Sequence, residues 1–280
     1  MTIVMYVISI LCVIAIILLV CGIATQYFPV SVYYEIKSEK LGRDYRIALL
    51  SDLHGVCHGK NNEKLIAMIE KAAPDFICIS GDMTVKNGLH TEDMLHLMKK
   101  LAEKYPVYYS PGNHEIRMWD YDSYKKQVKD FGVQYLENKS VPVYPDITIY
   151  GLDLPEYWYH KCWEKRCFKE SNMEELLGKC DDHKFSILLA HNPEYGRQYA
   201  LWGADLTMSG HVHGGIMRLP LLGGVISPSL RLFPHYDAGM FEEEDKKMIV
   251  SRGLGLHHIK IRIFNRPELS IINLTCQKRG

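Results

Sequence analysis

Three apolar segments of this 280-residue chain each lead directly into polar side chains, and they recur at a nearly constant interval. The segments cover residues 46–50, 76–79 and 107–109. Asp52, Asp82 and Asn113 follow them, at intervals of 30 and 31 residues. That interval matches the strand–helix–strand unit of roughly 30 residues that joins two parallel strands. Because open α/β sheets place their ligands at the carboxyl ends of strands, the pattern predicts a functional site there.

Amphipathic segments fill both intervals. Residues 62–73 carry apolar side chains on one helical face, and Pro74 follows the end of this predicted helix. Thr91 can cap a second helix, which closes before Pro106. Each helix is therefore expected to connect two parallel strands.

The second half of the chain has a different pattern: its apolar segments are short and are separated by glycines and turns. Strands are predicted at residues 146–151, 185–190, 205–209, 248–251 and 269–274. We find no internal repeat and no Ser/Pro-rich linker. Two runs of strands predict an α/β fold with two stacked β-sheets flanked by helices, an α/β/β/α sandwich. We assign residues 28–280 to one domain.

The N-terminal segment is apolar enough to cross a membrane. Residues 2–27 contain no charged side chain, and residues 3–24 are almost continuously apolar. Roughly 20 apolar residues cross a bilayer core of about 30 Å, so we predict one transmembrane helix within residues 1–27. A cleaved signal peptide is the alternative. Against it, no Lys or Arg precedes the run, the run is long, and no A-x-A site follows.

Charge and cysteine usage bear on the compartment. The apolar run is followed by Lys37, Lys40, Arg43 and Arg46, which favours a single-pass protein of the cell membrane with residues 28–280 in the cytoplasm. The eight cysteines form no CxxC pair, so we expect free thiols rather than a disulfide scaffold. The 33 basic residues balance 33 acidic ones, and therefore no nucleic-acid partner is expected.

Taken singly, the polar clusters have ordinary explanations. Asp52 could cap a turn, and Gly81-Asp82 is a common turn pair. A lone His191 after an apolar strand is more often a core histidine than a ligand. A glycine-flanked pair at i and i+2, such as His211 and His213, exposes both imidazoles if the loop is extended. Since every cluster ends an apolar strand, all of them can converge on one sheet edge.

Together the clusters form the ordered pattern D-x-H, G-D, G-N-H-E, H and G-H-x-H. This order resembles the calcineurin-like metallophosphoesterase family over residues 46–274. The flanking sequences LLSDLHG, ISGDM and SGHVHGG resemble the membrane-anchored branch of that family. That branch is similar to enzymes that hydrolyse UDP-diacylglucosamine and related phosphodiesters. Ile216 departs from the pattern, because Gln commonly follows GHxHGG in the family.

The resemblance implies a site for two divalent metal ions. The first ion would be held by Asp52, His54 and His213, and the second by Asn113, His191 and His211. Asp82 would bridge the two, because carboxylate oxygens can span ions about 3.5–4 Å apart. Two carboxylates against two divalent ions leave positive charge to attract a hydroxide and a phosphate ester. Four imidazoles favour Mn, Fe or Zn over Mg or Ca.

Two further residues of the G-N-H-E motif receive roles from the same resemblance. His114 would stabilise the transition state or protonate the leaving oxygen. Because His114 directly follows a proposed ligand, we expect it to point away from the metals. Glu115 would orient a ligand or His114 from behind.

Other polar residues have less specific interpretations. His58 is expected to be a solvated loop histidine, and Arg262 with Glu268 could form a structural ion pair. Residues 157–166 mix aromatic and basic side chains. This segment is either an amphipathic helix that packs Trp158 and Trp163 on the core or a cap that gathers an amphiphilic substrate.

The leading functional hypothesis is a dinuclear-metal hydrolase of phosphate esters. It would act as a phosphodiesterase or pyrophosphatase on lipid-linked or nucleotide-linked substrates. A phosphomonoesterase or protein phosphatase with the same metal core is the alternative. A non-catalytic interaction module is a third reading, disfavoured because all seven proposed ligands and His114 are present.

Overall fold

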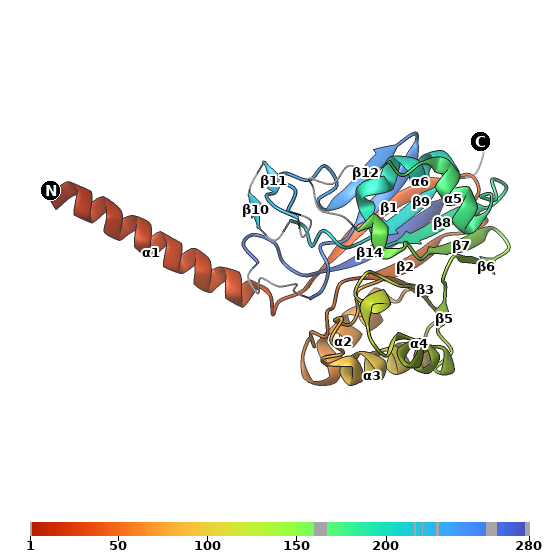
Figure 1. Ribbon diagram of the computed structural model, residues 1–280, viewed down its shortest axis with the longest axis horizontal. Coiled ribbons are helices and arrows are strands. Elements are labelled where there is room, and N and C mark those ends of the chain that lie inside the picture. Colours follow the sequence, from red (N-terminus) through yellow and green to blue (C-terminus); the bar gives the residue numbers. More distant parts are fainter. Residues whose placement is uncertain are drawn as a thin grey trace.

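Two stacked six-stranded sheets form the centre of the molecule, with helices on both outer faces (Figure 1). The computed structural model describes residues 2–159, 167–215, 217–219, 221–227, 230–255 and 262–277. The predicted α/β fold with two sheets is confirmed. Both sheets are mixed, because antiparallel pairs accompany a parallel centre in each.

The first sheet carries the three strands that the recurring interval predicted. Its order is β1 (Val30–Ser38), β14 (Glu268–Cys276), β2 (Tyr45–Leu50), β3 (Phe76–Ser80), β4 (Val107–Ser110) and β5 (Gln134–Tyr135). Strands β2, β3 and β4 are parallel neighbours, as expected. All residues of β3 and β4 are buried, which fits their continuous apolar or aromatic character.

The second sheet is built from the later strands. Its order is β12 (Gly239–Glu243), β13 (Lys246–Val250), β9 (Leu206–Ser209), β8 (Phe185–Ala190), β7 (Ile147–Leu152) and β6 (Lys139–Tyr144). Strands β7, β8 and β9 run parallel. A small hairpin, β10 (Arg218–Leu219) with β11 (Gly223–Gly224), stands apart from both sheets.

Three apolar layers hold these elements together. Leu49 and Cys78 of the first sheet pack against Ile187 and Met208 of the second in the central layer. The outer layer of the first sheet contains α2 (Glu63–Ala72), α3 (Thr91–Ala102) and α4 (Tyr121–Asp130). The outer layer of the second contains α5 (Glu170–Leu177) and α6 (Gly196–Trp202). The carboxyl ends of the central strands are thereby fixed relative to one another.

Helix α1 (Thr2–Thr25) projects away from this body (Figure 1). Among the described residues, α1 is the one helix that is both long enough and apolar enough to cross a membrane. The body buries none of its most apolar 18-residue stretch. Its place near the N-terminus is compatible with either a signal sequence or an anchor.

The aromatic–basic segment is described only at its start. Glu156–Trp158 forms a single 3-10 turn, and the ring of Trp158 lies 4.9 Å from that of Phe168. Trp158 therefore packs on the core, which is one of the two alternatives predicted for this segment. Trp163 and the other residues of 160–166 lie outside the described part, and so does Ile216.

Candidate metal centre

Five strands deliver the predicted site residues to one place. Strands β2, β3 and β4 of the first sheet lead into the D-x-H, G-D and G-N-H-E clusters, and β8 and β9 of the second lead into the remaining histidines. Positive φ angles turn the chain sharply at most of these positions: Asp52, His54, Asp82, His211 and His213. Such angles are uncommon outside glycine and tend to cluster at functional sites.

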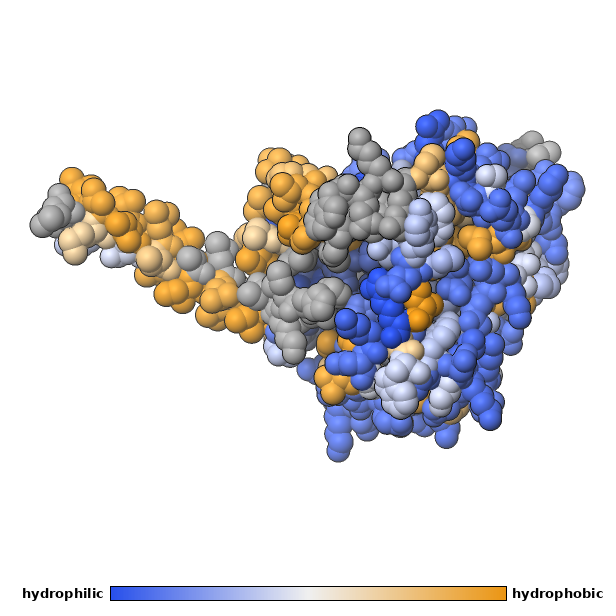
Figure 2. Space-filling model, in the orientation of Figure 1, coloured by the Kyte–Doolittle hydropathy of each residue, from blue (hydrophilic) through white to orange (hydrophobic). Residues whose placement is uncertain are grey.

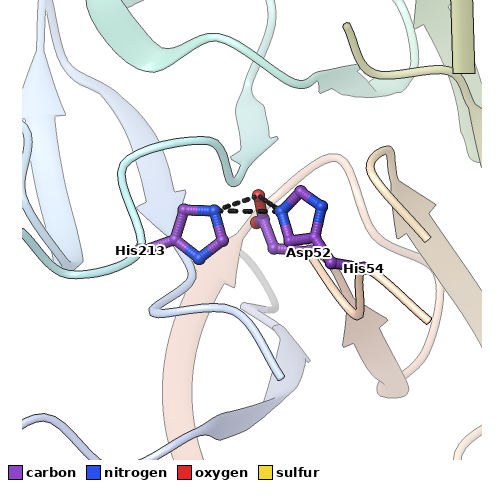
Figure 3. A group of neighbouring side chains, drawn as sticks. All are labelled: Asp52, His54 and His213. Atoms are coloured by element: carbon purple, nitrogen blue, oxygen red, sulfur yellow. Dashed lines mark hydrogen bonds and ion pairs between the residues drawn. The ribbon is translucent and has the colours of Figure 1, made fainter. Parts of the chain in front are cut away.

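The first group comprises Asp52, His54 and His213 (Figure 3). The Nε2 atom of His213 lies 3.3 Å from Asp52 Oδ1, and the Nε2 atom of His54 lies 3.8 Å from the same oxygen. The two Nε2 atoms are 3.1 Å apart. Two ring nitrogens and a carboxylate oxygen thus converge on one point, which is the arrangement of a divalent-cation site.

The second group comprises Asp82, His191 and His211. His191 Nδ1 donates to the carbonyl of Ser80 at 2.6 Å, which leaves Nε2 to face Asp82 Oδ2 at 3.1 Å. A hydrogen bond of this kind selects the tautomer of a metal-ligating histidine. The rings of His191 and His211 lie 5.2 Å apart.

The two groups adjoin each other. Asp82 Oδ2 lies 3.9 Å from His54 Nε2, and Asp52 Oδ1 lies 3.9 Å from His191 Nε2. Each aspartate thus reaches a histidine of the other group. His211 and His213 divide between the groups, although the expected extended backbone is wrong at this loop. Left-handed turns at both residues, with φ of 68° and 54°, separate their rings instead.

Burial makes the charges of this site interdependent. Burial raises the pKa of Asp52 to about 7, against the lowering effect of His191. Burial also opposes ionisation of Asp82, but His191 and other nearby imidazoles hold its pKa well below the usual value. Burial would lower the pKa of His191, yet Asp82 raises it to about 10. Asp82 is therefore held in its ionised form and stabilises positive charge beside it, which a cation site requires.

Asn113 supplies a direct test of whether a metal fits. Its side chain is 4% exposed, and within the described part of the chain its Oδ1 atom has no hydrogen-bond partner. A buried carbonyl oxygen left in this state costs about 1–3 kcal/mol unless something else binds it. An amide oxygen beside imidazoles and carboxylates fits a divalent ion, and the residues present therefore suit the metal centre.

His114 lies nearer the proposed ligands than its place next to Asn113 suggested. Its ring stands edge-on to that of His54, with centroids 4.6 Å apart. With His54 and Asp82 it forms a third group of potential metal-binding side chains. Its Nδ1 atom accepts a hydrogen bond of 3.4 Å from the backbone N–H of Lys86. That bond places the proton of a neutral imidazole on Nε2.

Glu115 holds the loops of the first sheet together. Its carboxylate is fully buried and accepts hydrogen bonds from the backbone N–H groups of Asp82, Gly112 and Thr84, at 2.8, 2.9 and 3.1 Å. The expectation that Glu115 acts from behind the site agrees with these contacts. It fixes the loop of Asp82 through the backbone rather than by touching a histidine.

Two residues behind the site correct the sequence-based expectations. Arg262 is 1% exposed and donates to the carbonyls of Arg252 and Gly255, at 2.9 and 2.5 Å. Glu268 pairs with Arg252 at 2.6 Å, so the expected Arg262–Glu268 ion pair is wrong. Arg252 takes the carboxylate while the loop carbonyls occupy the Arg262 guanidinium. Arg262 belongs to none of the sequence motifs, and the sequence around it is typical of a strand.

His58 is likewise buried rather than solvated, with 3% exposure. Its Nε2 atom donates to the carbonyl of Leu254 at 2.8 Å, and burial lowers its pKa. The next residue, Gly255, donates its N–H to the Asp52 carbonyl at 2.6 Å. His58 and Arg262 therefore both fix the loop against which Asp52 rests.

A cavity of about 550 Å³ opens beside the centre. Its inner wall contains His54, His114 and Lys86. It continues past Val56, Val85 and Leu89 to Gln26 and Tyr27, at the end of α1. Tyr159 does not line this cavity; its ring lies 5.3 Å from that of His211, in the second group.

Comparison with known proteins assigns the family. Residues 45–215 match the model of the calcineurin-like phosphoesterases. This chain belongs to that family. The chain is accordingly a metal-dependent phosphoesterase, a hydrolase whose family uses a binuclear metal centre, and the His/Asp cluster that could hold one is present.

The named relatives are distant. An uncharacterized metallophosphoesterase of Aquifex aeolicus is 29% identical over 250 residues, which cover 86% of this chain and 90% of the relative. The phosphodiesterase YaeI of Escherichia coli is 25% identical over 82% of each chain. The UDP-2,3-diacylglucosamine pyrophosphatase LpxG of Chlamydia muridarum is 30% identical, over 50% of this chain and 40% of that protein.

Proposed function

We propose that this chain is a membrane-anchored phosphodiesterase or pyrophosphatase with two metal ions, acting on lipid-linked or nucleotide-linked phosphate esters. Residues 1–27 would form a retained anchor, and residues 28–280 the catalytic domain. The observation that carries the proposal is the meeting of two groups of ligands, with Asp52 and Asp82 each within 3.9 Å of a histidine of the other group.

The ligand assignment follows the two groups. Asp52, His54 and His213 would hold one ion, Asn113, His191 and His211 the other, and Asp82 would lie between them. Mn, Fe or Zn suits this set, because imidazole ligands outnumber carboxylates. When bound, two such ions supply Lewis-acid stabilisation of phosphoryl oxygens and a nucleophile at neutral pH.

The side chains around the ions have separate tasks. His114 holds a proton at Nε2, because its Nδ1 accepts from Lys86, and that proton can bond a phosphoryl oxygen or pass to the leaving oxygen. Glu115 keeps the loop of Asp82 in place through three backbone bonds. These residues thus position and stabilise the ester.

Two observations favour an amphiphilic diester over a small soluble monoester. The cavity beside His54 and His114 has a mostly apolar lining surface, and its lining includes Tyr27, which follows the apolar helix α1. Relatives named a phosphodiesterase and a pyrophosphatase are similar to this chain over 82% and 50% of its length. An ester whose apolar part lies in a membrane could enter from the side of Tyr27.

The test uses the full chain purified in detergent micelles, with its metal content measured. Bis(p-nitrophenyl) phosphate, a pyrophosphate diester and p-nitrophenyl phosphate are compared with Mn²⁺ added. We expect the two diesters to turn over at least about tenfold faster than the monoester, a difference of ~1.4 kcal/mol in barrier. Chelation should abolish turnover, and Mn²⁺ should restore it.

A matched pair of variants supports the assay. Asp82→Asn should lose activity and metal together, whereas Asp182→Asn changes an exposed carboxylate outside the site and should change neither. Hydrolysis of the monoester alone would point to a phosphomonoesterase or protein phosphatase. Bound metal with no hydrolysis of any ester would point to an interaction module.

A further inference from the structure

A patch of large apolar side chains is exposed on the described surface beside the end of α1. We call it the apolar plate. Its members are Leu221, Leu222, Leu230, Leu232, Phe233 and Phe264. Leu221 is fully exposed, and Leu222 and Leu232 are 63% and 65% exposed. Figure 2 shows hydrophobic residues gathered over β10 and β11, next to the apolar helix.

Hydrogen bonds connect the plate to α1 through the segment before β14. The N–H of Arg262 donates to the carbonyl of Gly22 in the last turns of α1, at 3.1 Å. Ile263 follows, and its carbonyl accepts from the N–H of Arg218 in β10 at 3.0 Å. Leu221 and Leu222 form the tip of the hairpin that β10 begins. The plate is thus attached to the body at the level where α1 ends.

The surroundings of the plate have the chemistry of a bilayer interface. Tyr27 and Phe28, at the exit from α1, are exposed aromatic residues of the kind enriched at the membrane surface. Arg266 is exposed, and its Nε atom donates to the carbonyl of Phe28 at 3.0 Å. A cation placed here can meet an anionic headgroup while the neighbouring apolar side chains enter the acyl boundary.

We propose that the apolar plate inserts into the membrane surface beside α1, giving the catalytic domain a second, peripheral contact with lipid. A contiguous apolar patch of this kind marks an interaction site, and its junction with a membrane-length apolar helix identifies the partner as a lipid bilayer. The inference rests on the retained anchor of the proposed function. It adds an orientation: the contact holds the body so that the side of the cavity lined by Gln26 and Tyr27 faces the lipid.

The experiment places a photoreactive probe on the plate in the full chain. Leu222 or Phe233 is replaced by p-benzoylphenylalanine, and the protein is reconstituted into nanodiscs of equal parts phosphatidylcholine and phosphatidylglycerol. Leu201, exposed on α6 away from α1, carries the probe in the control. After illumination, mass spectrometry of the peptides should show lipid adducts at least about tenfold more abundant on the plate than at Leu201.

A second variant tests the cause. Leu221→Asp with Leu222→Asp should reduce lipid adducts at a Phe233 probe, because carboxylates are disfavoured in the acyl region. Leu201→Asp should leave them unchanged. Equal adducts at the plate and at Leu201, or cross-links to a second copy of the chain in place of lipid, would overturn the proposal.

Diester hydrolysis separates this proposal from the proposed function. The plate contributes none of the proposed ligands, so the Leu221/Leu222 variant should still hydrolyse bis(p-nitrophenyl) phosphate in detergent. In the chain without the Asp substitutions, plate adducts no more abundant than those at Leu201, together with intact hydrolysis, would reject only the membrane contact. Strong lipid adducts without hydrolysis of any ester would reject only the proposed reaction.

Discussion

His191 shows how one hydrogen bond sets the chemistry of a side chain. The carbonyl of Ser80 accepts from Nδ1, and Nε2 therefore faces Asp82. His114 has the reverse arrangement, because its Nδ1 accepts a backbone N–H. One ring is thus prepared to bind a cation through Nε2 and the other to offer a proton from the same atom.

This difference predicts the effect of removing His114. We expect His114→Ala to retain both metals and to lose at least about 100-fold in kcat, the usual scale for a lost proton donor. Steady-state hydrolysis of the diester gives kcat, and elemental analysis gives the metal content. His96→Ala, at an exposed histidine on α3, is the matched control and should behave as wild type. Normal turnover in the His114 variant would remove this residue from the mechanism.

The residues of the centre could be predicted from the sequence because each follows an apolar strand within a short, ordered motif. Arg262 and His58 could not be predicted in their roles. Both act on backbone carbonyls of the 252–255 loop, and a carbonyl acceptor leaves no trace in residue identity. The pairing of Glu268 was equally hidden, because it depends on which arginine the loop brings closer.

The loops that follow the strands of the site pack against one another so closely that a side chain larger than hydrogen does not fit between them. A Cβ atom added at Gly112 would lie 2.7 Å from the backbone nitrogen of Asp82. In the other loop, a Cβ atom added at Gly81 would lie 2.5 Å from the backbone nitrogen of Gly112, and Gly81 has a φ of 83°. The loops after β3 and β4 thus pack backbone to backbone, and Glu115 ties them together.

That packing predicts that Gly112→Ala pushes the Asp82 loop away from the centre. We expect the affinity for Mn²⁺ to fall by about 10–100-fold, the range seen when groups that orient metal ligands are disturbed. Equilibrium dialysis against Mn²⁺ measures this affinity. Gly42→Ala is the control, because its nearest neighbour would lie at an ordinary 3.4 Å. Unchanged Mn²⁺ binding in the Gly112 variant would contradict the close packing of these loops.

Strands with continuous apolar character were predictable to within one or two residues, as β3 and β8 illustrate. The edge strands were not. Strand β1 has charged, exposed positions and owes its place to pairing with β14, some 240 residues away in the chain. Helix α4 is rich in charged residues and buries only Tyr124 and Val128, so its apolar pattern is too sparse to predict. Pairing with a strand distant in the sequence decided β1, and the packing of two buried side chains decided α4.

The whole molecule combines a compact catalytic body with an apolar helix that the body does not cover. Four basic residues follow that helix, and they predict a cytoplasmic body. Alkaline phosphatase fused after Gly280 should therefore be inactive in intact cells, whereas β-galactosidase at the same position should be active. The intact mass of the membrane-bound protein should include residues 1–27. An active alkaline phosphatase fusion would place the body outside.

Arg262 contacts both parts of the molecule. Its backbone N–H bonds to Gly22 in α1, while its guanidinium fixes the loop on which Asp52 rests. A tilt of α1 would therefore act on the loop beside Asp52 through Arg262. If α1 is retained in a bilayer, as proposed, a change of its tilt to match bilayer thickness would be transmitted mechanically to the side chains proposed to hold the metal ions.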